Sequence, residues 1–183
     1  MKKAKILGVD YLGLQHEIEY CREKSMKIVM CSGTFDLFHI GHMKFLEDAK
    51  SRGDILIVAV KSDKAAALKK DDPPVLEQKI RMETVAYNSL VDYVAMVDFE
   101  PKRGIPFEFE NVASYQWLNM FNPLLELIRP DIFVHEDSNT LANARKQMFL
   151  KYNIEGVIHQ RMEGISTTKI IEKIEKRLLL KLQ

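Results

Sequence analysis

Two histidines three residues apart stand at the start of a predicted helix, just after a glycine turn. Residues 33–42 read Gly-Thr-Phe-Asp-Leu-Phe-His-Ile-Gly-His and follow the apolar run 28–31, which predicts a strand. The N–H groups and the positive dipole end of a helix start attract anions. His39 and His42 would add hydrogen-bond donors that stabilise charge as it builds on such an anion. Residues 33–42 therefore predict a phosphate-binding site.

Two further polar clusters are expected near this site. Residues 163–168 read Glu-Gly-Ile-Ser-Thr-Thr, so Ser166–Thr168 is predicted to cap a second helix start. Residues 134–137 read Val-His-Glu-Asp and complete an apolar run. In an open parallel sheet, ligands bind beyond the carboxyl ends of the strands. The three clusters are therefore expected to meet at one crevice.

Short apolar runs alternate with longer helical patterns along the chain. Strands are expected at 27–31, 55–60, 93–97, 132–135 and 156–160. Helices are expected at 12–24, 42–52, 77–90, 140–151 and 167–182. This alternation is typical of βαβ units with right-handed crossovers. The predicted fold is α/β, a Rossmann-like three-layer sandwich with a five-stranded parallel sheet.

Length and composition favour one cytoplasmic domain over residues 1–183. The chain has 27 Lys and Arg against 26 Asp and Glu, so it lacks the concentrated positive charge that nucleic-acid binding requires. Cys21 and Cys31 make no disulfide framework, which favours a reducing compartment. The N-terminus does not read as a signal peptide. No membrane association is expected, because no segment approaches the roughly 20 apolar residues of a membrane span.

Three segments stand outside the alternation. Residues 1–25 form a leading helical segment. Residues 61–76 are charged and contain Pro73-Pro74, so we expect a mobile loop. Residues 98–122 hold several aromatic side chains and are expected to form an insertion. This insertion is either a lid or contact surface, or a loop packed on its own side chains.

Three motifs together resemble the HxGH nucleotidyltransferases. They are GTFDLFHIGH (33–42), Arg81 and RMEGISTTKII (161–171), and the resemblance covers about residues 27–175. Within that superfamily the chain looks like the small cytidylyltransferases of the glycerol-3-phosphate cytidylyltransferase type. The leading segment before residue 30 is instead similar to the heptose-phosphate adenylyltransferases.

The resemblance implies a nucleotidyltransferase. The enzyme would transfer CMP from CTP to a small phosphorylated alcohol or sugar, with release of pyrophosphate. Adenylyl transfer from ATP to a sugar phosphate is the alternative, and CTP is favoured. The attacking phosphate oxygen is already anionic near neutral pH, so no general base is required. Mg2+ is expected, held mostly by the triphosphate with at most one carboxylate. A homodimer is a further option, to which the stripe Ile170, Ile171, Ile174 and Leu178 would contribute unless it is core.

The resemblance also assigns roles to residues of this chain. The catalytic candidates are His39, His42, Lys44 and Arg161. The nucleotide-binding candidates are Gly33, Thr34, Phe35, Lys69, Lys70, Arg81, Asp137, Ile165, Ser166, Thr167 and Thr168. Lys44 could equally be a solvated helix lysine, and Arg81 could simply pair with Glu77. Asp36 and Asp63 are expected to cap turns or orient a loop rather than to bind metal.

One position departs from the family pattern. Related enzymes carry a glycine before the aspartate after the fourth strand, whereas this chain has Glu136 before Asp137. Glycine would allow close approach to a nucleotide, and Glu136 instead brings a negative charge near a triphosphate. Together with Pro73-Pro74, this leaves open a protein of another class, a nucleotide-binding regulator without turnover.

Overall fold

A computed structural model describes residues 3–7, 11, 13–67, 73–98, 112–137 and 141–181, with the backbone alone for 112–117. Its centre is a parallel sheet of six strands in the order β1-β4-β3-β2-β5-β6. The strands are β1 (Lys5–Leu7), β2 (Ile28–Gly33), β3 (Ile55–Lys61), β4 (Tyr93–Val97), β5 (Ile132–Glu136) and β6 (Glu155–His159). The prediction of a five-stranded sheet is therefore wrong, because the sheet has six strands. Strand β1 has only three residues, too few to show a period, and it is defined by its pairing with β4.

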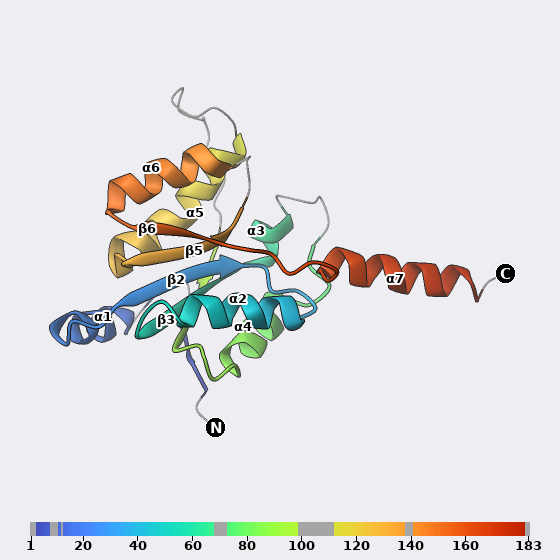
Figure 1. Cartoon of the computed structure of the whole chain (residues 1–183), viewed down its shortest axis with the longest axis horizontal. Helices are drawn as coiled ribbons and strands as arrows, with labels where there is room; N and C mark the ends of the chain where they lie inside the picture. Colours follow the sequence, from blue (N-terminus) through green and yellow to red (C-terminus); the bar gives the residue numbers. More distant parts are fainter. Residues whose placement is uncertain are drawn as a thin grey trace.

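Helices cover both faces of the sheet, as the three-layer prediction requires (Figure 1). They are α1 (Leu14–Glu23), α2 (Ile40–Lys50), α3 (Asp63–Ala67), α4 (Gln78–Ala86), α5 (Val112–Ile128), α6 (Ala142–Tyr152) and α7 (Thr167–Leu179). Side chains of α1, α5 and α6 join one buried cluster, and those of α2 and α4 join a second. Alternate residues of the central strands belong to the two clusters, so these strands are buried on both faces.

Two segments expected as loops contain helices. Residues 112–122 belong to α5, which connects β4 to β5. Phe121 of this helix is fully buried in the core, so this half of the expected insertion is a crossover helix. The aromatic and proline content hid the helical pattern; Pro123 lies inside the helix. Residues 99–111 lie outside the described residues. Helix α3 likewise occupies part of the expected loop at 61–76.

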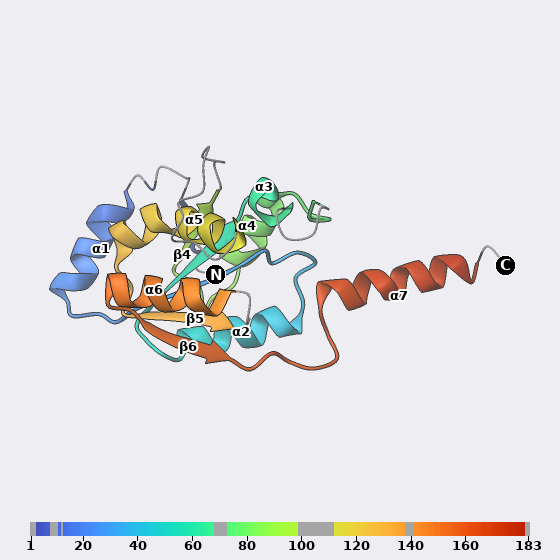
Figure 2. The same ribbon diagram turned by 90° about the horizontal axis from the view of Figure 1, so that it is seen from above.

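Helix α7 projects away from the rest of the molecule (Figures 1 and 2). None of its described residues is buried, and Ile174 and Leu178 are 50% and 57% exposed. The apolar stripe of α7 is therefore not part of the described core. In the parts of the chain that the structure describes, no helix is both long and apolar enough to cross a bilayer.

Candidate active site

The predicted phosphate site lies where the strand order of the sheet reverses. From β2 the chain passes to β3 and β4 on one side, and β5 and β6 lie on the other side of β2. In an α/β sheet this switch point is the usual place for a ligand. The loop after β2 leads here into α2, whose N-cap is His39.

The two histidines form a reciprocal cap at the start of α2. His39 Nδ1 accepts the Gly41 N–H at 3.1 Å, and His42 Nδ1 accepts the His39 N–H at 3.3 Å. The two rings stack with centroids 3.9 Å apart. Because each Nδ1 is an acceptor, the proton of each neutral ring is on Nε2. Both side chains therefore carry an Nε2–H donor that the cap does not use.

Burial keeps these imidazoles neutral. It lowers the pKa of His42 to about 4, with His39 as a second cause, and it also lowers the pKa of His39. Gly41 lets the His39 ring lie close, since a Cβ at position 41 would stand 3.0 Å from it. At neutral pH each ring therefore keeps Nδ1 as the acceptor of the cap and carries its one proton on Nε2 as a donor.

Asp36 holds the loop before α2 to two other segments. Its carboxylate accepts the N–H groups of Val75 and Leu76 at 2.8 and 2.9 Å. Its backbone oxygen accepts the Thr167 hydroxyl at 2.8 Å. On either side of Asp36, Phe35 and Leu37 have positive φ angles of 56° and 43°, a conformation that costs energy in residues other than glycine. The prediction that Asp36 orients a loop is confirmed.

Arg81 is a buried link between the same segments. Its side chain is fully buried and donates to the backbone oxygens of Thr34, Lys61 and Leu76. Its ion pair is with Asp63, at 2.7 Å, rather than with Glu77, the partner named in the alternative to nucleotide binding. Asp63 also accepts the N–H of Gln78, as expected of a residue that caps a turn. Gly33 and Phe35 pack against each other in this loop.

The start of α7 faces the start of α2, as predicted. Ser166 caps α7 by accepting the Lys169 N–H, and Thr167 bonds to Asp36. Ile165 lies 3.6 Å from the point where a Cβ on Gly41 would stand. Thr168 follows on the exposed side of the first turn. Two helix starts thus lie side by side at one edge of the sheet.

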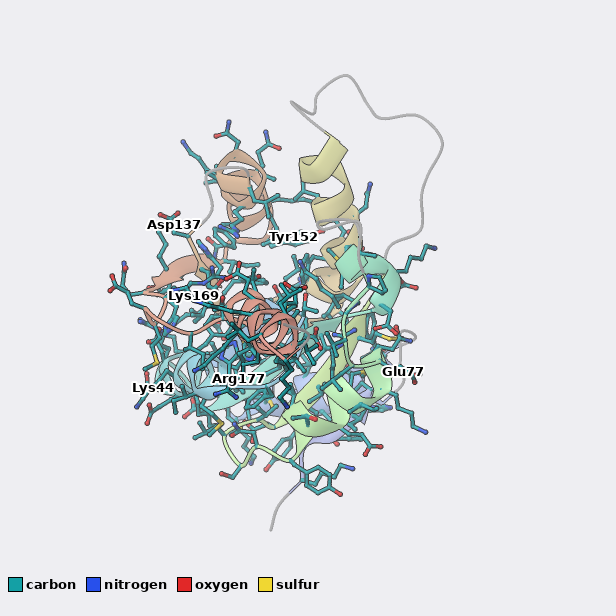
Figure 3. The ribbon with its side chains drawn as sticks, turned by 90° about the vertical axis from the view of Figure 1, so that its right-hand side faces the viewer. Lys44, Glu77, Asp137, Tyr152, Lys169 and Arg177 are labelled. Carbon is teal, nitrogen blue, oxygen red and sulfur yellow. The ribbon has the colours of Figure 1, made fainter. Side chains whose placement is uncertain are left out.

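Figure 3 views this edge from the end where α7 projects and labels the candidates Lys44 and Asp137. Arg161 binds the carboxylate of Glu136 through two hydrogen bonds, at 2.6 and 3.1 Å. Lys44 is exposed on α2 and pairs with Glu47 at 2.7 Å. This placement matches the alternative interpretation of Lys44 as a solvated helix lysine. The candidates Lys69 and Lys70 lie outside the described residues.

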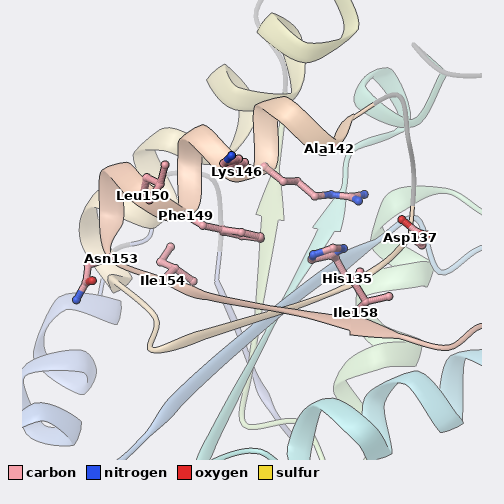
Figure 4. A pocket seen from close by; sticks show the side chains of 10 residues that line it. His135, Asp137, Ala142, Lys146, Phe149, Leu150, Asn153, Ile154 and Ile158 are labelled. Atoms are coloured by element: carbon pink, nitrogen blue, oxygen red, sulfur yellow. The ribbon is translucent and has the colours of Figure 1, made fainter.

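Asp137 borders a separate hollow on the α6 face of the sheet. This hollow has a volume of about 440 Å³ and lies between α6 and strands β5 and β6 (Figure 4). His135 and Phe149 stack within it, and His135 Nδ1 donates to the backbone oxygen of Glu136. The sequence carries no signal for this hollow, because its lining comes from strands and a helix that only the fold brings together.

The sequence assigned no role to His159, which the structure uses to join β6 to α2. His159 contacts the carboxylate of Asp48 at 2.7 Å and packs edge-on against Phe45. A lone histidine in a sequence carries no signal for such a contact.

The described residues contain no group of three His, Cys, Asp or Glu side chains that could hold a metal ion. Asp36 and Asp63 are engaged by N–H donors and by Arg81, and Glu136 is engaged by Arg161. These side chains do not fit a resident metal centre.

The fold and the site define an α/β protein in which two helix starts meet at the switch point of its sheet. Residues 30–173 match the family model described as "Cytidylyltransferase-like", and the chain belongs to this family. The resemblance to nucleotidyltransferases in the sequence motifs is confirmed, and the protein is a nucleotidyltransferase-like enzyme.

Curated relatives match most of this chain. The "Bifunctional protein HldE" of Helicobacter pylori (strain G27) is 34% identical over 166 residues, 90% of this chain and 31% of that protein. The HldE protein of Geobacter metallireducens is 31% identical over 93% of this chain and 31% of its own length. The chain thus spans about a third of the length of these relatives.

The similarity to solved structures concerns the fold alone. A lipopolysaccharide core biosynthesis protein from Thermoplasma volcanium aligns with a TM-score of 0.55 at 22% identity, over 75% of this chain and 99% of that one. A pantoate-beta-alanine ligase from Francisella tularensis aligns with a TM-score of 0.58 at 18% identity, over 91% of this chain and 75% of that one.

Proposed function

We propose that this protein transfers the adenylyl group of ATP to the phosphate of a heptose phosphate and releases pyrophosphate. The observation that carries the proposal is the pair of neutral histidines at the start of α2, whose Nε2–H groups remain as donors. The start of α7 supplies a second set of N–H groups and hydroxyls beside them. Such donors suit the spread of charge over a triphosphate during transfer.

In the proposed reaction, an oxygen of the acceptor phosphate attacks the α-phosphorus of ATP. The new bond joins this oxygen to the α-phosphorus, and the bond to the β-phosphate oxygen breaks, so pyrophosphate leaves. The attacking oxygen is already anionic, which removes the need for a base. His39 and His42 would donate to the phosphate oxygens, and Arg161 would pair with the charge on the leaving group. Catalysis then depends on alignment and charge stabilisation.

ATP replaces CTP as the favoured nucleotide in this proposal. The motifs favoured CTP, but the HldE relatives support adenylyl transfer to a heptose phosphate instead. The leading segment before residue 30 is similar to the same group of enzymes. Both observations concern the nucleotide and the acceptor, and they leave the type of reaction unchanged.

Magnesium enters this proposal as part of the nucleotide substrate. The carboxylates of Asp36, Asp63 and Glu136 are engaged by protein donors, so the ion would arrive bound to the triphosphate. The protein itself would then hold the phosphates through uncharged and cationic donors.

A pyrophosphate-release assay tests the proposal. Each of the four nucleoside triphosphates is combined with a panel of phosphorylated sugars and alcohols that includes heptose 1-phosphate. The proposal expects the fastest release with ATP and the heptose phosphate. Release with CTP and a phosphorylated alcohol would restore the cytidylyltransferase interpretation. ATP that raises the thermal stability without any turnover would instead support the nucleotide-binding regulator.

A further inference from the structure

Glu136 lies at the end of β5 on the face of the sheet that α2 covers. Val134, two residues earlier, belongs to the buried cluster under α2, and side chains two apart on a strand share a face. His135 lies on the opposite face, stacked on Phe149 of α6. Glu136 therefore points to the side of the sheet where the two capping histidines stand.

The carboxylate of Glu136 occupies the edge of Arg161 that a phosphate would use. Glu136 Oε1 accepts from Arg161 Nε at 3.1 Å, and Oε2 accepts from Nη2 at 2.6 Å. A guanidinium presents this fork to carboxylate and to phosphate in the same geometry. The two ligands therefore exclude each other at these nitrogens.

Both members of the pair lie within electrostatic reach of the histidines. Burial is the main cause that lowers the pKa of His39 and of His42. Among the further causes, the charge of Glu136 raises both pKa values and that of Arg161 lowers them. The ion pair is thus part of the same charge environment as the donors at the start of α2.

The pair is also accessible enough to exchange. The side chains of Arg161 and Glu136 are 68% and 42% exposed. Exposed ion pairs contribute little free energy, because water solvates both partners when they separate. A ligand with several negative charges can therefore replace the single carboxylate.

We infer that Glu136 is an internal competitor of polyphosphate for Arg161, and so sets the affinity of the site. Arg161 is engaged by Glu136 until the phosphates of a ligand displace the carboxylate. The inference rests on the proposed function in that the natural polyphosphate would be ATP.

Binding of inorganic tripolyphosphate, measured by titration calorimetry, tests the inference. Glu136→Gln should bind tripolyphosphate about two- to fivefold more tightly than the unaltered protein, the range expected for an exposed ion pair. Glu155→Gln is the matched control, since it removes the same charge at the opposite end of β6 and should leave binding unchanged. In an Arg161→Gln background, the gain from Glu136→Gln should disappear.

Unchanged or weaker binding by Glu136→Gln would overturn the inference, because Glu136 would then be neutral or would hold Arg161 in its binding position. A gain that persists without Arg161 would also overturn it, since net charge alone would explain the result. Turnover of ATP is measured in a separate assay, so that the proposed function and the role of Glu136 are tested independently. Tighter tripolyphosphate binding without any turnover would refute the proposed function and leave the role of Glu136 standing.

Discussion

Replacing Arg81 with methionine tests whether this residue builds the site or binds the nucleotide directly. Its side chain is fully buried and joins three backbone oxygens and the Asp63 carboxylate. Methionine fills a similar volume but leaves all four acceptors without this donor. Breaking one side of a buried ion pair costs about 3–5 kcal/mol. Because Asp63 is partly exposed, the lower end of this range applies, and we expect the free energy of unfolding to fall by about 3 kcal/mol.

The loss is measured by urea unfolding and by thermal unfolding. At this chain length about 3 kcal/mol corresponds to a fall in Tm of roughly 6–12 °C. Arg81→Lys should recover little, because one ammonium cannot reach the four acceptors that the guanidinium joins in different directions. Arg52→Met is the control: Arg52 follows the end of α2, pairs with Asp48 of that helix and is one-third exposed, so its loss should cost less than about 1 kcal/mol. Stability near that of the unaltered protein, combined with a large loss of ATP affinity, would refute the structural role of Arg81.

Four further predictions follow from the histidines, the link between the loops, and the metal. His42→Asn should lower turnover about a hundred- to thousandfold, because the new side chain can accept the His39 N–H but lacks the Nε2–H donor; a loss under tenfold in steady-state rate would contradict this. Between pH 6.5 and 4, the free energy of unfolding of the unaltered protein, measured in urea, should fall by about 2 kcal/mol relative to that of His42→Asn. Below pH 6.5 the imidazole of His42 binds a proton in the unfolded state, whereas in the folded state, with its pKa of about 4, it does not. Parallel pH profiles of the two proteins would contradict the lowered pKa. Thr167→Val should cost about 1 kcal/mol in unfolding and weaken ATP binding in calorimetry, since the hydroxyl holds the start of α7 to Asp36; unchanged ATP affinity would contradict this link. A chelator should abolish pyrophosphate release and leave the thermal unfolding of the ligand-free protein unchanged; a fall in its Tm would reveal a metal bound by the protein itself.

The main features of the fold could be predicted because the inner strands β2, β3, β4 and β5 each contain a short apolar run. The run 55–60 is buried on both faces and coincides with most of β3. Strand β1 could not be predicted, because a strand of three residues is defined by its neighbour β4. Helix α5 was missed because its aromatic residues and Pro123 resemble those of a loop, whereas burial of Phe121 and Leu124 makes it part of the core.

The site was predictable where local geometry decides it. The two histidines and Ser166 cap their helices through neighbours within three residues, which a sequence motif can encode. The partners of Arg81 and Arg161 lie up to 47 and 25 residues away, and only the fold brings them together. Charge type alone therefore could not tell that Arg81 is buried in a network or that Glu136 engages Arg161.

The stoichiometry of pyrophosphate release is the most direct test of the central claim, nucleotidyl transfer to a phosphate acceptor. The purified protein is incubated with ATP, Mg2+ and heptose 1-phosphate, and ATP, pyrophosphate and the product are measured together. We predict one pyrophosphate and one adenylylated sugar for each ATP consumed, and no pyrophosphate when the acceptor lacks its phosphate. Pyrophosphate release that does not depend on the phosphate acceptor, or no release with any triphosphate and acceptor, would contradict the account.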